Sequence, residues 1–228
     1  MPRNKNGTVG IKSDRPALRV VCEPPRRRTN REVRVREYLT TEELQRLIKA
    51  ARKHGRNSGR DALMIAMATR HGLRASELCS MLWSQIDWKT ARLTVLRNKG
   101  SVDSTHPLTG GELRALRAIR RGVGDDARYV FMSELGAPTT PAGFRKMLSR
   151  VGVRCGLRTV HPHMLRHSCG FAMAEAGEDV RAMQDWLGHA AIQNTVRYTA
   201  LAPGRLDKVK APDLIRPWRA NRPRANLG

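Results

Sequence analysis

Acidic residues are scarce in this sequence, with 20 Asp and Glu against 43 Lys and Arg among 228 residues, a formal charge of +23. The acidic side chains nowhere form a tight cluster of the kind that two-metal nuclease chemistry needs. So large a basic excess goes beyond what solubility requires. It predicts a polyanionic partner and favours nucleic acid over a ribosomal assembly or a membrane surface.

Cysteine is also sparse, and the four cysteines show no C-x-x-C spacing: Cys22, Cys79, Cys155 and Cys169. This spacing argues against a disulfide framework and against a zinc site, and it predicts free thiols in a reducing compartment. Cys79 and Cys169 lie in apolar helical surroundings and are expected in the core.

Long apolar runs are absent as well. No stretch reaches membrane-spanning length, and the first residues, MPRNKNGTVGIK, lack the apolar core of a signal peptide. We therefore expect an intracellular protein without a membrane partner.

The basic excess extends through the whole chain. Residues 1–38 carry 11 basic and 4 acidic side chains, residues 199–228 carry 7 and 2, and the middle keeps 25 against 14. We expect a flexible basic arm at 1–38, one folded domain at 39–202 and a basic tail at 203–228. A basic folded body indicates a DNA-binding surface rather than a neutral enzyme with a charged tail.

Apolar periodicity predicts a mostly helical domain with a small antiparallel sheet, an α+β fold. Thr40 with Glu43, and Thr109 with Glu112, have the spacing of capping boxes. The expected helices are 41–54, 61–71, 73–82, 110–122, 141–153, 162–176, 179–187 and 191–198. The expected strands are 86–88, 93–96 and 105–108, with a short extended piece at 129–131.

Candidate chemistry concentrates between His161 and Tyr198, which hold four of the seven histidines and one of three tyrosines. His163 and Arg166 are three residues apart and so share a helical face. Arg74 opens another helix directly after a buried one. Two forked guanidinium groups can hold the non-bridging oxygens of a phosphodiester, most strongly where charge builds up in the transition state.

Tyr198 is the candidate nucleophile, nine residues after His189. A free phenol has a pKa of about 10, so it needs neighbouring cations or a base to react near neutrality. Each residue also has a purely structural interpretation: Arg74 and Glu77 as an ion pair, His163 as a cap, Tyr198 as a packing residue. Metal binding at His161-Pro162-His163 is disfavoured because no further ligand set lies nearby.

Taken together, the motifs HGLRASEL, KG in a hairpin turn, HPHMLRH, WLGH and TVRYT, in this order and spacing, resemble the catalytic domain of the tyrosine recombinase (phage integrase) family. The likeness covers residues 38–202 and is greatest to the short members that invert the promoter switch of bacterial fimbrial operons. The resemblance implies the recombinase catalytic-domain fold and a bacterial, cytoplasmic, nucleoid-associated enzyme that cuts and rejoins DNA without metal, ATP or another cofactor.

The resemblance also implies a role for each matched residue. Arg74, His163 and Arg166 would activate the scissile phosphate, and His189 would bind it and assist. Tyr198 would attack phosphorus, and Glu77 would support Arg74. Lys99 would be the general acid, preferred over Arg97 because its Asn-Lys-Gly turn matches the short members.

The implied partners are double-stranded DNA, three further subunits in a tetramer on two recombination sites, and accessory DNA-bending proteins. One departure from the family pattern stands out. In typical members a helical core-binding domain precedes the catalytic domain, whereas in this sequence we expect the 38-residue basic arm in that position. Two alternative functions are a catalytically silent DNA-binding regulator with the same fold and a type IB topoisomerase.

Overall fold

Reciprocal caps begin two of the helices. Thr40 Oγ1 accepts the Glu43 N–H at 3.3 Å while the Glu43 carboxylate accepts the Thr40 N–H at 2.9 Å. Thr109 and Glu112 repeat the arrangement at 3.2 and 2.8 Å. Because each cap satisfies backbone donors that a helix start leaves open, helices α2 and α5 begin where the sequence predicts.

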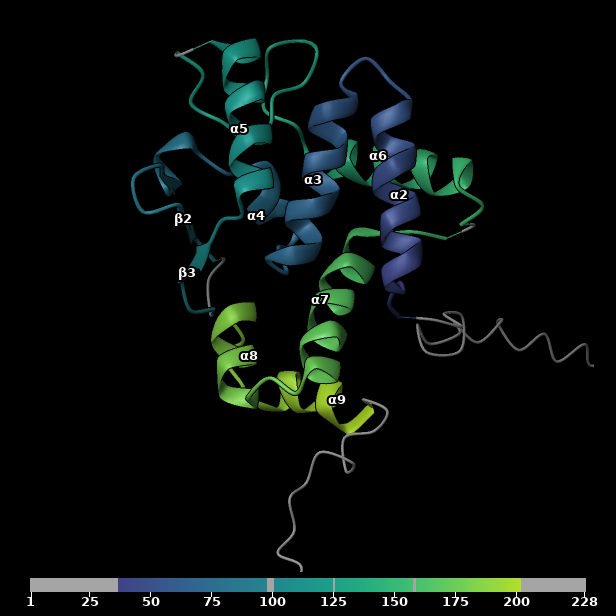
Figure 1. Ribbon diagram of the computed structural model, residues 1–228, viewed down its shortest axis with the longest axis vertical. Coiled ribbons are helices and arrows are strands. Elements are labelled where there is room, and N and C mark those ends of the chain that lie inside the picture. Colours follow the sequence, from purple (N-terminus) through teal and green to yellow (C-terminus); the bar gives the residue numbers. More distant parts are fainter. Residues whose placement is uncertain (1–36, 98–100, 125, 158, 202–228) are drawn as a thin grey trace, which may run out of the picture. The chain divides into compact units, whose positions relative to one another are not determined.

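The computed structural model describes residues 37–97, 101–124, 126–157 and 159–201, all within a unit that starts at Arg36. Residues 1–36 of the expected arm, the expected tail and Lys99 lie outside the described residues. The last two residues of the arm are described, and Tyr38 packs against Phe171 with ring centroids 4.1 Å apart. The elements follow in this order (Figure 1): α2 (Thr41–Lys53), α3 (Ser58–Arg70), α4 (Ala75–Cys79), a 3-10 turn (Trp83–Gln85), β1 (Ile86–Asp87), β2 (Arg92–Val95), β3 (Ser104–Pro107), α5 (Gly110–Val123), α6 (Pro141–Arg154), α7 (Pro162–Ala176), α8 (Val180–Leu187) and α9 (Gln193–Leu201).

The three strands form an antiparallel sheet in the order β1-β2-β3, with Leu93 opposite both Ile86 and His106. β2 and β3 lie one residue earlier than predicted. Asp87 accepts the N–H groups of Lys89 and Thr90, and Ala91 takes a left-handed conformation (φ 54°). The turn occupies the residues before Arg92, so the pairing of β2 with β1 begins at Arg92.

The helix expected at 73–82 is much shorter than its apolar pattern indicates. Only Ala75–Cys79 is helical, with Arg74 as its N-cap residue. Met81 is nevertheless buried, and its carbonyl accepts the Val130 N–H at 2.9 Å. Pairing with the extended segment near 130 therefore replaces the last helical turn. The last helix is also displaced, from 191–198 to Gln193–Leu201.

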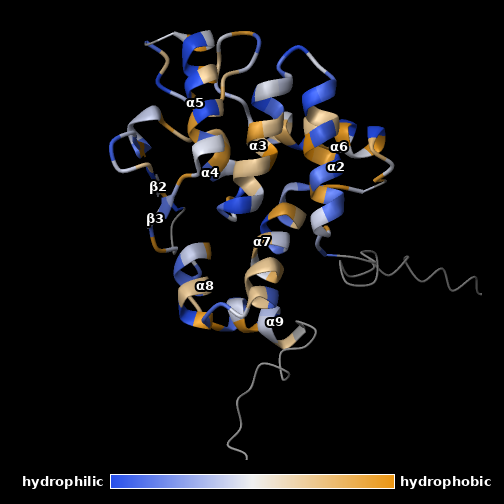
Figure 2. Cartoon of the chain, viewed as in Figure 1, coloured by the Kyte–Doolittle hydropathy of each residue, from blue (hydrophilic) through white to orange (hydrophobic). Residues whose placement is uncertain are grey.

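Two apolar clusters hold the unit together. The larger lies among α2 to α6, where α3 is buried on nearly all sides, and it includes Leu47, Ile65 and Phe144. The smaller joins α7, α8 and α9 through Phe171, Met183, Leu187, Cys169 and Tyr198. Figure 2 shows apolar residues along α7. Cys79 and Cys169 are buried free thiols, as predicted.

Candidate active site

Arg74 is anchored by a buried carboxylate. Its backbone N–H donates to Glu77 Oε2 at 2.8 Å and its Nη1 to Glu77 Oε1 at 2.6 Å. Burial by itself would raise the pKa of Glu77, but the Arg74 N–H, the Arg97 charge and the Arg74 guanidinium together lower it. The carboxylate is therefore ionised. The Arg74 side chain keeps 29% exposure, so one side of its guanidinium faces solvent.

Arg97 shares the same carboxylate from the sheet side. Its Nη1 donates to Glu77 Oε2 at 2.8 Å, and its Nη2 donates to the Trp186 carbonyl at 2.5 Å. The side chain has no exposed area, and burial is the largest cause that lowers its pKa. With both terminal nitrogens engaged inside the protein, Arg97 is poorly placed to donate a proton to a leaving group.

Arg166 is held by two helix-end carbonyls. It is 5% exposed, and its Nη1 and Nη2 donate to the carbonyls of Gly72 at 2.5 Å and Leu187 at 2.6 Å. Burial, followed by the charges of Arg74 and Arg97, lowers its pKa to about 10, so it remains a cation at neutral pH. Three guanidinium groups thus interact around one carboxylate, which leaves a net positive site for an anion.

His163 lies one helical turn before Arg166 but is exposed on the first turn of α7. Its ring centroid is 6.5 Å from those of His161 and His167. Of the predicted pair, Arg166 is therefore a buried cation, and His163 is an exposed side chain on the same helix.

His189 follows the end of α8 and is oriented by a threonine. Its Nδ1 is 2.9 Å from Thr195 Oγ1. Burial and then the charge of Arg166 lower its pKa to about 4, so the imidazole is neutral. Gly188 precedes it with φ 64°, and a Cβ there would lie 2.8 Å from Arg97 Nε. Only glycine meets both the conformation and the close approach of the arginine.

Tyr198 is covered in this structure, with only 2% exposure. Its ring stacks on His189 with centroids 6.3 Å apart and meets the Phe171 ring edge-on at 5.3 Å. Its hydroxyl is 2.9 Å from His167 Nδ1. Burial raises the pKa of the phenol despite the opposing charges of Arg197 and Arg166. The Tyr198 hydroxyl is therefore protonated as well as covered.

Comparison with known proteins places this arrangement in a family. The model of the phage integrase family matches residues 37–205. The chain belongs to the phage integrase family. It is similar to the type 1 fimbriae regulatory protein FimB of Escherichia coli K12, 41% identical over 175 residues, which cover 75% of this chain and 87% of FimB. FimE of the same strain is 37% identical over 172 residues, 72% of this chain and 86% of FimE.

Solved structures show the same catalytic-domain fold. A crystal structure of XerA recombinase superposes with a TM-score of 0.64 at 28% identity, over 75% of this chain and 62% of that one. This chain thus spans about three fifths of the length of the XerA chain. A structure of XerH recombinase bound to its difH substrate supports the fold. It superposes with a TM-score of 0.65 at 23% identity, over 79% of this chain and 54% of that one.

Sequence reasoning gave His167 and Arg197 no part in the chemistry, yet both contact the family's candidate nucleophile. His167 Nδ1 is the hydrogen-bond partner of the Tyr198 hydroxyl. Arg197 Nη2 lies 3.2 and 3.3 Å from the two His167 ring nitrogens. Burial, then the Arg197 charge, lowers the pKa of His167 to about 3. A neutral His167 can accept the phenolic proton in a hydrogen bond. The only sequence signal for a role of these two residues is their position: His167 directly follows Arg166, and Arg197 directly precedes Tyr198.

A second buried network of hydrogen bonds and ring contacts adjoins the candidate site. His71 Nδ1 is 3.1 Å from His106 Nδ1, and His71 Nε2 is 3.1 Å from Glu112 Oε1. The Trp186 ring stacks on His106 with centroids 4.0 Å apart. Burial is the main cause that lowers the pKa of His106 to about 3. This network joins the residues just before Arg74 and His189 to β3 and α5.

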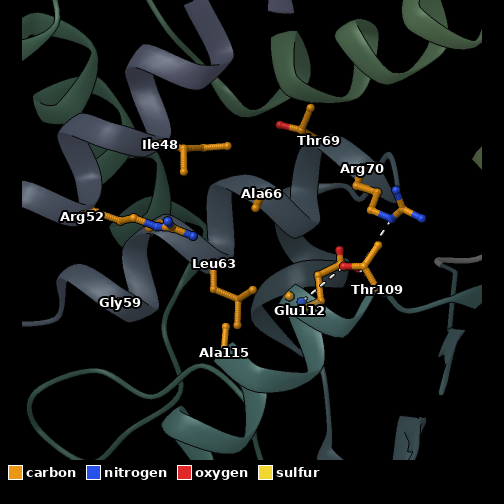
Figure 3. A pocket seen from close by; sticks show the side chains of 12 residues that line it. Ile48, Arg52, Gly59, Leu63, Ala66, Thr69, Arg70, Thr109, Glu112 and Ala115 are labelled. Carbon is orange, nitrogen blue, oxygen red and sulfur yellow. Dashed lines mark hydrogen bonds and ion pairs between the residues drawn. The ribbon is translucent and has the colours of Figure 1, made fainter.

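A separate cavity of about 490 Å³ lies between α2, α3 and α5 (Figure 3). Ile48, Leu63 and Ala66 line it, with Arg70 paired to Glu112 at 3.5 Å on its edge. None of the predicted site residues lines this cavity, so it is not where the chemistry is assembled.

Within the described ranges, no group of three His, Cys, Asp or Glu side chains is arranged to hold a metal ion. None of the described helices is both long and apolar enough to cross a membrane.

Proposed function

We propose that this chain is a site-specific DNA recombinase that breaks and rejoins strands through Tyr198. The observation that carries the proposal is the convergence of Arg74, Arg97 and Arg166 around Glu77, with His189 and Tyr198 beside them. A net positive site next to a tyrosine suits attack on a phosphodiester, because the guanidinium groups stabilise the charge that develops on phosphorus oxygens.

Each residue has a role in the proposed reaction. Arg74, Arg166 and His163 hold the non-bridging oxygens, and His189 binds the phosphate and assists. The Tyr198 hydroxyl passes its proton to the neutral His189 as its oxygen forms a bond to phosphorus. The bond from phosphorus to the 5′-oxygen breaks, and Lys99 protonates that oxygen as it leaves. The product is a 3′-phosphotyrosine with a free 5′-hydroxyl. The ester keeps the bond energy, so a partner strand's hydroxyl reverses the step without a nucleotide cofactor or metal.

The covered hydroxyl of Tyr198 adds one step to this scheme. Its hydrogen bond to His167 must break, and α9 must shift against α7, before the phenol reaches phosphorus. We infer that DNA in the site favours the shift, because a phosphate beside Arg166 interacts with the exposed phenol and not with the covered one.

The proposed partners are double-stranded DNA, a homotetramer on two synapsed sites and accessory DNA-bending proteins. We propose residues 39–202 as the catalytic unit. We also propose that residues 1–38 and 203–228, of which the structure describes only Glu37 and Tyr38, make DNA and subunit contacts. Inversion of a DNA segment is the outcome that the likeness to FimB and FimE favours. We place the reaction in the bacterial cytoplasm, on nucleoid DNA.

Trapping on a nicked suicide substrate tests the proposal. The wild-type protein should form a covalent adduct that survives denaturing electrophoresis, and Tyr198→Phe should form none because it lacks the oxygen. Binding of the same DNA by Tyr198→Phe is the control for folding. Equal adducts from both proteins would overturn the assignment of Tyr198.

The second candidate is a catalytically silent DNA-binding regulator, which the covered Tyr198 favours. In that case the wild-type protein would bind the substrate without an adduct. Tyr198→Phe would then retain full function in cells.

A further inference from the structure

The outer side of α5 carries a row of arginines. Arg114, Arg117 and Arg121 are exposed and spaced three and four residues apart, so they lie along one strip of the helix. The single acidic residue of α5, Glu112, is buried in the first turn, where it bonds to His71 and Thr109. Figure 2 shows strongly hydrophilic residues along α5, alternating with apolar ones.

These arginines repel one another in the free protein. Like charges at these spacings disfavour a helix. Among the described residues, no carboxylate forms an ion pair with Arg114, Arg117 or Arg121. Asp87 precedes Trp88 at the end of β1, but its carboxylate already accepts hydrogen bonds from Lys89 and Thr90. The row therefore stays positive, and an external anion would relieve its repulsion.

Two tryptophans restrict Arg117 of this row and the adjacent Arg120. The rings of Trp83 and Trp88 stack with centroids 6.2 Å apart. Arg120 Cζ lies 5.1 Å from the Trp83 ring centroid, and Arg117 Cζ lies 5.7 Å from that of Trp88. Cation–π contacts restrict the guanidinium groups, so less freedom is lost when they bind a ligand.

Trp88, Arg117, Arg120 and Arg121 line one open depression of about 370 Å³, which we call the α5 surface. Arg128 adds a further exposed cation nearby, because its carbonyl accepts the Trp83 N–H at 3.1 Å. An aromatic ring with several forked cations is the combination that binds a sugar-phosphate backbone.

The α5 surface is separate from the candidate active site. α5 begins beside it, where Glu112 contacts His71, and then runs away from α7, α8 and α9 (Figure 1). Arg121 is nine residues beyond Glu112, about 13 Å along the helix axis. A phosphate bound at Arg117 and Arg121 is therefore not the one that Arg74 and Arg166 hold.

We propose that the α5 surface binds the phosphate backbone of duplex DNA outside the segment held at the active site. The existence of an anion-binding surface follows from α5 alone, whereas the choice of DNA rests on the proposed function. DNA held at the active site brings flanking duplex close to the molecule at high effective concentration. An acidic protein segment is the competing occupant, and the experiment separates the two.

The test measures the salt dependence of binding to a 60-base-pair duplex by fluorescence anisotropy, with full-length protein. Removing two phosphate contacts in Arg117→Gln/Arg121→Gln should weaken binding several-fold and lower the slope of log affinity against log salt by about 2. The matched control is Arg52→Gln/Lys53→Gln, which removes the same charge from two exposed positions on α2. The control should keep the wild-type slope.

Two results would overturn the proposal: a wild-type slope for the α5 variant, or equal losses in the α5 and control variants. An unchanged melting temperature of each variant checks folding. The variant should also keep wild-type adduct formation at saturating DNA, since neither arginine belongs to the active site. If Tyr198 failed its own test while the slope still fell, the α5 surface would stand as part of a DNA-binding protein without strand cleavage.

Discussion

At the scale of single residues, the Glu77 carboxylate organises the candidate site. Arg74, three residues before it, and Arg97, just after β2, bind its two oxygens at 2.6 and 2.8 Å. Glu77 and Arg97 have almost no exposed side-chain area. A buried ion pair of this kind is costly to break, because the remaining charge loses its partner without regaining water.

Replacing Arg97 tests this arrangement. Arg97→Met should lower the free energy of unfolding by about 3 kcal/mol. Glu77 loses one of its two arginine partners, and the Trp186 carbonyl loses the Arg97 donor. It should also slow adduct formation, since Arg97 links the sheet to the end of α8. Arg97→Lys keeps the charge and should recover part of both losses.

Urea denaturation and suicide-substrate kinetics measure these two effects. Arg52→Met, at an exposed position of α2, is the control and should change the free energy of unfolding by less than about 0.5 kcal/mol. Wild-type stability in Arg97→Met would show that the ion pair contributes nothing.

At the scale of elements, the contact between α7 and α9 decides whether the Tyr198 side chain is covered. α7 presents Gly170 and Phe171 to the Tyr198 ring, and His167 on the same helix takes the hydroxyl. A Cβ at Gly170 would lie 2.7 Å from Tyr198 Cζ, which is too close for a carbon contact. Glycine at this position therefore permits the close packing of α9.

Gly170→Ala should lower the free energy of unfolding when Tyr198 is present, because the methyl group collides with the ring. In a Tyr198→Ala background the same change should raise it by about 0.5–1 kcal/mol, the helix preference of alanine over glycine. Urea denaturation of the four proteins of this double-mutant cycle gives the coupling. A stabilising Gly170→Ala in both backgrounds would contradict the close contact.

At the scale of the whole molecule, three histidines are kept neutral in the folded state. Burial is the largest cause at each, and it lowers the pKa of His106 and His167 to about 3 and that of His189 to about 4. The unfolded chain has histidine pKa values near 6.5. The unfolded state therefore binds more protons below that pH.

The resulting stability is present above pH 6.5 and is lost as the pH falls from 6.5 toward 4. We expect a lower melting temperature at pH 5 than at pH 7.5, and no change between pH 7.5 and 8.5 from these groups. The lowered carboxylate pKa values, as at Glu77 and Glu112, act below this window. A melting temperature that does not fall by pH 5 would exclude three neutral histidines.

Local features of the fold follow from the sequence alone. The Thr40–Glu43 and Thr109–Glu112 caps, and the turn at Gly72, depend on residues within four positions of each other. The sheet and most helices were predicted within a few residues. The motif order likewise indicated the family before the comparisons did.

The state of the candidate site was decided by contacts between distant parts of the chain. The Arg97–Trp186 hydrogen bond spans 89 positions and the His167–Tyr198 contact spans 31. Sequence spacing could name Tyr198 as a nucleophile but could not show that folding covers its hydroxyl. Nor could it show that Arg97 is enclosed, because burial depends on which helices pack together. The sequence by itself determined the family and the local elements, and only the tertiary structure decided which charged and phenolic groups face solvent.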